Sequence, residues 1–343
     1  MSLSVDESDN PVTKGSDPLV GFDARDAVAP QLRGWGRYAR DLLAALRRRG
    51  GLDLLALSAG GRGPELVWEQ LSLPRILRRE HAALVHSPNC FLPLRRPCPG
   101  VVTLHDLAWE EHPGDFARAT AWKYRMFAPR AARSAERVIC VSEFTRDDAQ
   151  RRYGIDPAKV RVIGEAPSLA LGNSEPPPGP YFLAVGDLRK KKNFARLVEA
   201  FGVLRREGLE HRLVIAGRDA GEGDRLRADG VELPGYVDEE RLDALMRGAD
   251  LLVHPSLYEG FGLVIVEAMA RGVPVACARA TALPETGGDA ALYFDPLDVQ
   301  DMAETIRRAL ADETLGARGR KRVATMSWDD AAAKTAAVYR ELL

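Results

Sequence analysis

The sequence predicts an α/β protein built from two Rossmann-like domains that face each other across a cleft. Short apolar runs alternate with amphipathic helical patterns in both halves of the chain, an order typical of parallel sheets covered by helices. Residues 164–180 contain five prolines and separate the two series, as a linker would. With 343 residues, the chain is long enough for two domains that each bury a core.

The composition is that of an ordinary globular protein. Apolar residues make up 45% and charged residues 28% of the chain, and no apolar run is long enough to cross a bilayer. Residues 1–17 are polar and acidic, which predicts a disordered leader. The four cysteines lack C-x-x-C spacing, so we expect free thiols in a reducing, cytoplasmic location.

Charge is spread unevenly along the chain. Residues 1–172 carry a net charge of +4 and the remainder carries −5. The basic half could face an anionic acceptor or an anionic membrane surface, and a solvated charged surface is the alternative. Residues 116–137 place arginines among Trp122, Tyr124 and Phe127, which fits either core packing or an interfacial membrane helix. No nucleic-acid partner is expected, and the oligomeric state stays open.

The first half opens with a strand, a glycine turn and a helix. Residues 19–23 are the strand, Gly34 and Gly36 lie in the turn, and residues 39–49 form a helix that stops at two glycines. This order is typical of the start of a Rossmann-like unit. Taken alone, the two glycines indicate only a tight turn.

Polar residues follow the next strands of this half. Residues 84–87 and 101–107 are predicted strands, and His105 and Asp106 stand at the end of the second. Ligands of open α/β sheets gather beyond the carboxyl ends of strands, so both are candidate site residues. The alternative is a histidine that only caps the strand end. After a further strand, Ser142 is a predicted helix N-cap.

The second half repeats the pattern from residue 181. A strand at 181–186 and a helix at 194–206 flank a turn with four consecutive cations, Arg189 to Lys192. Such a run could neutralise a diphosphate or form a solvated loop. Later segments are predicted as the strand 212–217, the run 231–237 and the helices 298–311 and 327–343.

The stretch Ala249 to Pro274 holds the most specific pattern. An apolar strand leads to a turn with Gly260 and Gly262, and Glu259 and Glu267 stand eight residues apart on either side of it. Glycines let backbone N–H groups approach an anion at a helix N-terminus. The two carboxylates could then accept hydrogen bonds from sugar hydroxyls in one cleft, or they could be ordinary surface and helix residues.

These segments together resemble a known family. E-G-F-G-L-V-I-V-E, followed by A-M-A-R-G-V-P-V-A, resembles the E-x7-E signature of retaining, GT-B-fold glycosyltransferases of family 4. G-W-G-R-Y, T-L-H-D-L and K-K-K-N are similar to three further family segments. The resemblance covers nearly all of the chain from residue 18. It implies an acceptor-side domain at 18–172, a donor domain at 173–326 and a closing helix at 327–343 that crosses back to the first domain.

The resemblance also implies a role for each candidate residue. Glu267 would bind the ribose, Glu259 the donor sugar, Lys192 the phosphates, and His105 would orient sugar and acceptor, with His105, Glu259 and Lys192 as the catalytic set. The remaining donor contacts would come from Gly34, Gly36, Arg189, Val237, Gly260, Phe261, Gly262 and Leu263, and Asp106 would lie on the acceptor side.

One position departs from the family pattern. Many members carry arginine directly after the glycine that ends the strand, and this chain carries Asp187. One phosphate contact is therefore in doubt, with Arg189 or Lys191 as possible substitutes.

The predicted function is transfer of a sugar, with retention, from a nucleotide diphosphate sugar to a glycan, a lipid-linked or a small-molecule acceptor. GDP-mannose is the first candidate donor and a UDP-sugar the second. No cofactor or metal is expected, because no Asp-x-Asp stands at a strand end in the cleft segments. The alternatives are a sugar-nucleotide-binding protein with weak catalysis and a GT-B sugar-nucleotide epimerase.

Overall fold

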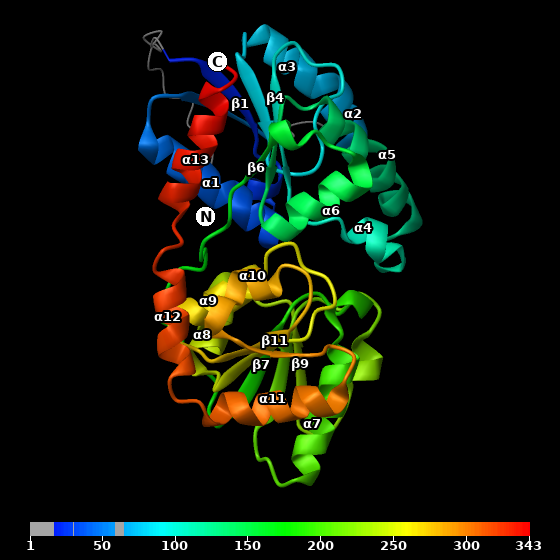
Figure 1. Ribbon diagram of the computed structural model, residues 1–343, viewed down its shortest axis with the longest axis vertical. Helices are drawn as coiled ribbons and strands as arrows, with labels where there is room; N and C mark the ends of the chain where they lie inside the picture. Colours follow the sequence, from blue (N-terminus) through cyan, green and yellow to red (C-terminus); the bar gives the residue numbers. More distant parts are fainter. Residues whose placement is uncertain (1–16, 30, 59–64) are drawn as a thin grey trace.

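Two parallel sheets organise the computed structural model, which describes residues 17–29, 31–58 and 65–343 (Figure 1). In the described part, each sheet has six strands and helices on its faces. Two Rossmann-like α/β domains are thus present. The predicted leader lies, apart from Asp17, outside the described residues.

The first sheet has the strand order β2-β1-β3-β4-β5-β6. Its strands are largely buried apolar runs, as expected where helices cover both faces. The chain order reverses between β1 and β3, where Val20 pairs with Leu84. The strands are β1 (Leu19–Asp23), β2 (Asp53–Leu57), β3 (Leu84–Ser87), β4 (Gly100–Leu104), β5 (Arg137–Cys140) and β6 (Val160–Val162).

The second sheet has the order β12-β11-β10-β7-β8-β9, so its reversal lies between β7 and β10, where Leu252 pairs with Leu183. Ligands of open α/β sheets bind beyond the carboxyl ends of strands at such a reversal. The strands are β7 (Tyr181–Val185), β8 (Arg212–Ala216), β9 (Val231–Gly235), β10 (Leu251–His254), β11 (Val275–Ala278) and β12 (Leu292–Phe294).

Helices cover the first sheet. Ser142 caps the N-terminus of α6 as predicted, since its side chain accepts a hydrogen bond from the Thr145 amide. The helices are α1 (Gly34–Arg49), α2 (Glu65–Val67), which continues into a π-helical turn (Trp68–Ser72), α3 (Leu73–Arg79), α4 (Ala108–Glu111), α5 (Arg118–Ser134) and α6 (Glu143–Tyr153).

In the second domain, α7 packs with α11 and α8 packs with α9 (Figure 1). The helices of the second half of the chain are α7 (Phe194–Arg206), α8 (Glu239–Gly248), α9 (Leu263–Arg271), α10 (Leu283–Gly287), α11 (Val299–Ala311), α12 (Leu315–Val323) and α13 (Trp328–Arg340). Single 3₁₀ turns occupy Asp26–Val28, Pro113–Asp115, Pro157–Lys159, Lys190–Lys192, Gly223–Leu226 and Gly288–Ala290. No helix in the described ranges combines the length and apolar character needed to cross a bilayer.

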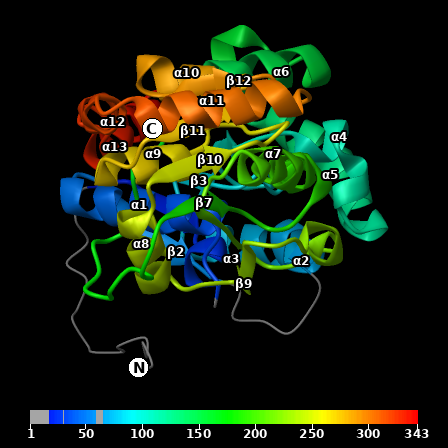
Figure 2. The ribbon, with the colours of Figure 1, turned by 90° about the horizontal axis from the view of Figure 1, so that it is seen from below.

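The C-terminal helix α13 returns to the first domain and packs along α1, which confirms the predicted crossing (Figures 1 and 2). Tyr339 is fully buried there, and its hydroxyl lies 2.5 Å from Nδ1 of His86 on β3. The other ring nitrogen of His86 lies 2.9 Å from the Thr103 hydroxyl. Burial lowers the pKa of His86 to about 3, so the ring is neutral in the folded protein.

Candidate active site

The loops that follow β7 and β10 meet at the reversal point of the second sheet. The 3₁₀ turn Lys190–Lys192 follows β7, and the loop that carries Glu259 follows β10. The backbone joins the two loops, since the Leu257 amide donates to the Lys191 carbonyl at 2.8 Å. The topology therefore brings together two segments that lie far apart in the sequence.

Lys192 and Glu259 form an ion pair at this point. Nζ of Lys192 lies 2.5 Å from Oε1 of Glu259, and Nε2 of His254 lies 3.1 Å from the same oxygen. Burial favours a raised pKa for Glu259, but the charge of Lys192, the His254 hydrogen bond and the nearby Lys191 outweigh it and hold that pKa well below its usual range. Burial lowers the pKa of His254. The structure thus places an ionised carboxylate beside an ammonium group that could meet an anion.

Glycine is favoured at both positions of the following turn, for different structural reasons. Gly262 has a φ of +99°, which favours glycine, and it precedes Leu263, the first residue of α9. Gly260 has no such backbone, but a Cβ there would lie 1.6 Å from the His105 carbonyl oxygen of the first domain. Gly260 is therefore needed for a close approach between the domains. Phe261, between them, packs against buried side chains of both domains.

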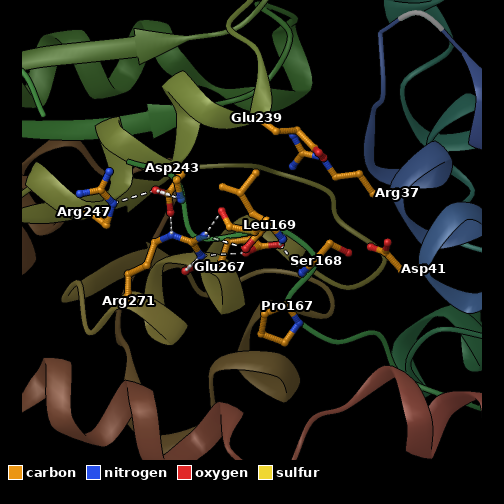
Figure 3. A network of polar contacts seen from close by, with 12 residues as sticks. Arg37, Asp41, Pro167, Ser168, Leu169, Glu239, Asp243, Arg247, Glu267 and Arg271 are labelled. Carbon is orange, nitrogen blue, oxygen red and sulfur yellow. Dashed lines mark hydrogen bonds and ion pairs between the residues drawn. The ribbon is translucent and has the colours of Figure 1, made fainter. Parts of the chain in front are cut away.

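Glu267 lies on α9 and is fully buried. Its Oε1 accepts hydrogen bonds from the backbone amides of Ser168 and Leu169, at 2.5 and 2.8 Å, and its Oε2 pairs with Nη1 of Arg271 at 3.0 Å. Burial raises the pKa of Glu267 despite these bonds. The predicted ribose-binding carboxylate is thus covered by the interdomain linker (Figure 3).

Side chains from both domains hold this part of the linker in place. Nη2 of Arg271 donates to the Leu169 carbonyl at 2.8 Å, and Nε1 of Trp328 donates to the Pro167 carbonyl at 3.1 Å. Arg271 is itself fixed by Asp243 at 2.8 Å, which also pairs with Arg247 (Figure 3). Linker residues 167–169 are therefore held in a fixed position across α9.

His105 directly follows β4, which ends three residues before the predicted strand end, and it is 5% exposed. Its Nδ1 lies 3.0 Å from Glu165 and its Nε2 lies 2.9 Å from the Pro88 carbonyl. The ring stacks on Trp35 at 5.4 Å between centroids, and Tyr38 contacts it edge-on at 4.5 Å. Both ring nitrogens of His105 therefore have partners in the first domain. This arrangement fits a histidine that caps the strand end better than an exposed catalytic base.

The predicted glycine turn before α1 is wrong. Gly34 and Gly36 form the first turn of the helix, which starts five residues earlier than expected, and neither has a positive φ. Gly36 is required because a Cβ would lie 2.5 Å from the Asp26 carbonyl oxygen, whereas a Cβ at Gly34 would meet no atom within 4 Å. The residue before them, Arg33, reaches across to Asp187 of the second domain at 3.5 Å.

The loop after β7 has several partners in the first domain. Lys191 is buried and its Nζ lies 3.4 Å from Asp106, while its amide donates to the Asp115 carboxylate at 2.9 Å. Arg189 donates to the Asp115 carbonyl. Lys191 thus links the two domains. This contact argues against Lys191 as the substitute phosphate ligand.

Asp187 gathers three guanidinium groups within about 3.6 Å, from Arg33, Arg189 and Arg218. Asp187, which stands where the family pattern has arginine, is thus surrounded by three arginines that it engages in ion pairs. Of these arginines, the sequence predicted only Arg189 as a substitute for the missing phosphate contact. Arg33 and Arg218 were not predicted.

Four other residues at the contact between the domains were not predicted from the sequence. Glu239, at the start of α8, pairs with Arg37 at 3.0 Å and Arg40 at 2.8 Å on α1. Glu165 contacts His105 from the linker side. Arg37 and Arg40 lie one turn apart in a helix, a spacing that suggests a shared partner. The neighbouring sequence does not identify that partner. Val237, predicted near the nucleobase, follows β9 and packs against the second core.

Comparison with known proteins decides the family. Residues 172–325 match the model of glycosyl transferases group 1, and residues 52–166 match that of glycosyltransferase family 4. This chain is a family 4 glycosyltransferase. It is 32% identical to the O-antigen chain mannosyltransferase B of Escherichia coli, over 76% of this chain and 74% of that protein. It is 30% identical to the MMP alpha-(1->4)-mannosyltransferase of Mycolicibacterium hassiacum, over 82% and 76%.

Solved structures share the GT-B fold of this glycosyltransferase. Sucrose-phosphate synthase from Thermosynechococcus elongatus superposes with a TM-score of 0.74 at 23% identity, covering 95% of this chain and 99% of that one. Anabaena HepE, solved in complex with UDP and glucose, superposes with a TM-score of 0.69 at 19% identity, covering 95% and 100%. At these identities the likeness concerns the fold alone.

Proposed function

We propose that this glycosyltransferase moves a sugar, with retention of anomeric configuration, from a nucleotide diphosphate sugar to a glycan, lipid-linked or small-molecule acceptor. The observation that carries the proposal is the Lys192–Glu259 pair at the reversal point of the second sheet, beside the N-terminus of α9. Glu267 lies on the same helix. An ammonium group, helix amides and two carboxylates suit a diphosphate joined to two sugars.

Each group has a role in this scheme. Lys192 and the α9 amides offset the charge on the leaving diphosphate, Glu259 holds the transferred sugar, and Glu267 accepts from the ribose hydroxyls. The acceptor oxygen bonds to the anomeric carbon on the face from which the phosphate departs. The leaving phosphate takes the acceptor proton, so His105 has a positioning role. No step uses a metal, and we expect transfer to continue in EDTA.

Mannose is the first sugar to test. Two relatives named as mannosyltransferases support it, and GDP-mannose is our first donor and a UDP-sugar the second. The four cysteines carry no disulfide, which supports a reducing, cytoplasmic site of action.

Calorimetry with GDP and UDP, together with transfer assays, tests the roles. Lys192→Ala should weaken nucleotide binding by roughly 10- to 100-fold, the value of a charge-assisted hydrogen bond. Glu267→Ala should also weaken binding, whereas Glu259→Ala should mainly slow transfer. Lys190→Ala, exposed in the same turn, and Glu304→Ala, exposed on α11, are matched controls. Binding in the Lys192 and Glu267 variants equal to that of the controls would refute the assignment.

Asp187 motivates a second function, a sugar-nucleotide-binding protein with weak catalysis. Donor hydrolysis separates the two, because a transferase leaks some sugar to water and a binding protein does not. Conversion of the donor to an isomer without an acceptor would instead indicate an epimerase.

A further inference from the structure

One face of α5 is basic and aromatic. The helix contains five cations and no carboxylate. Its large exposed side chains recur at helical spacing along one side, which we call the outer face of α5: Arg118, Trp122, Arg125, Met126, Arg130 and Arg133. Trp122 is 57% exposed. Figures 1 and 2 show α5 along the outer edge of the first domain, on the side away from α13.

Most of the positive charge on this face is not neutralised. Arg130 and Arg133 donate to the carbonyls of Met126 and Tyr153, and these bonds leave their charge intact. Arg118 has no ion pair among the described residues, and Arg125 has one, with Glu110 at 3.3 Å. A solvated helix usually carries both signs of charge, whereas a face that combines arginines with Trp and Met is typical of an interfacial helix.

A neighbouring segment adds exposed apolar side chains. Lys123 points inward from α5 and pairs with Glu65 and Glu69 at 2.8 and 2.9 Å, which holds α2 and its π-helical turn against α5. That segment exposes Val67 and Leu71, at 45% and 49%. Large apolar side chains are thus exposed on two elements that the Lys123 ion pairs join.

A hollow of about 480 Å³ opens beside the outer face. Three arginines of α5 line it, Arg125, Arg130 and Arg133, with Arg152 of α6 and a single carboxylate, Glu110. Guanidinium groups bind phosphate through bidentate hydrogen bonds. Arg152 pairs with Asp148 and Glu111, and Arg125 pairs with Glu110, so Arg130 and Arg133 are the lining arginines that have no ion pair among the described residues. These two free guanidinium groups suit the phosphate of a lipid head group.

We propose that the outer face of α5 docks this protein on an anionic membrane surface, with Trp122 and Met126 at head-group depth and the arginines on lipid phosphates. The turn before α5 carries Asp115, which bonds Arg189 and Lys191 of the donor loop. Docking brings the cleft close to the membrane, within reach of an acceptor that is anchored there.

Vesicle sedimentation tests the proposal on the full chain. The protein should bind vesicles of phosphatidylcholine mixed with phosphatidylglycerol, bind phosphatidylcholine alone far less, and dissociate as salt is raised. Arg125→Gln, Arg130→Gln and Arg133→Gln together should weaken binding on the order of a hundredfold, taking about fivefold for each arginine. Trp122→Ala with Met126→Ala should weaken it as well, by loss of apolar burial.

The matched control replaces three exposed arginines of the second domain, Arg225, Arg227 and Arg308, with glutamine. It changes the net charge equally, so it should bind like the wild type. Equal loss in both triple variants, equal wild-type binding to both vesicle types, or undiminished binding of the Trp122 and Met126 variant would overturn the proposal. Each result is independent of whether sugar transfer is observed.

Discussion

At the scale of single residues, the ionised state of Glu259 depends on its neighbours. The carboxylate is 12% exposed, and burial alone would favour its protonated form. Lys192, His254 and Lys191 reverse that preference and depress its pKa. Lys192, which we propose meets the donor phosphates, therefore also holds the Glu259 carboxylate in place.

This coupling predicts how stability depends on pH. A carboxylate with a depressed folded-state pKa stabilises the folded protein above its unfolded pKa of about 4.3, and the stabilisation is lost as the pH falls through the folded value. The free energy of unfolding of the wild type should exceed that of Glu259→Gln by about 1 to 3 kcal/mol near pH 7, and this difference should shrink below about pH 4. Urea denaturation across pH measures it.

Glu304→Gln is the control for this series, since its exposed carboxylate contributes little at any pH. A difference between wild type and Glu259→Gln that grows as the pH falls would contradict the depressed pKa.

At the scale of elements, the linker and α9 share one carboxylate. Glu267 cannot accept from a ribose while its Oε1 accepts from the amides of Ser168 and Leu169 in a fully buried position. If Glu267 binds the ribose, the linker must give up these two bonds. Donor binding and linker movement would then be one event.

Hydrogen exchange provides the measurement. Saturating GDP or UDP should speed exchange at the amides of Ser168 and Leu169, because their acceptor passes to the ribose. The Gly172 amide, bonded to Asp243 at 2.9 Å, should be unchanged and is the internal control. Slower exchange at Ser168 and Leu169 with nucleotide bound would show that linker and ribose share Glu267 without competition.

The contact of α13 with β3 predicts a loss of stability in Tyr339→Phe. The variant keeps the buried ring but leaves one nitrogen of the neutral His86 without its partner, at a cost of about 1 to 3 kcal/mol. The urea midpoint should fall accordingly. Tyr236→Phe, at an exposed position, should leave it unchanged. Equal midpoints for wild type and Tyr339→Phe would mean that water replaces the hydroxyl.

Strands and helices with strong local patterns were predictable from sequence. Helix α7 has the predicted bounds, and the strand ends at β4 and β7 placed His105 and the lysine turn correctly. The helical conformation of the G-W-G segment at residues 34–36 was not predictable, because glycine suits a turn and a closely packed helix equally well. The Asp26 carbonyl that makes glycine necessary at position 36 is a tertiary contact, which the local sequence does not reveal. The partners of Glu267 are backbone amides of a proline-rich linker, which carry no sequence signal.

At the scale of the whole molecule, the two domains are held in a closed arrangement by hydrogen bonds across their interface. The Tyr258 hydroxyl donates to Asp148 at 2.6 Å and accepts from the Leu107 amide at 3.2 Å. Glu285 accepts from the first two amides of α6, at 2.8 and 3.1 Å, where a negative charge suits the helix N-terminus. Ser142 donates to the Gly260 carbonyl at 2.6 Å.

Gly260→Ala should therefore force the domains apart. Its Cβ would lie 1.6 Å from the His105 carbonyl, and backbone on both sides leaves no flexible atom to yield. We expect a larger radius of gyration in X-ray scattering and transfer slowed about 100-fold, since misplacement by 1 Å has that effect, while nucleotide binding by the second domain persists. Gly202→Ala, whose nearest contact is a flexible Arg206 atom at 3.6 Å, should scatter and react like the wild type. Unchanged scattering and rate in Gly260→Ala would mean that the closed arrangement is not the one that dominates in solution.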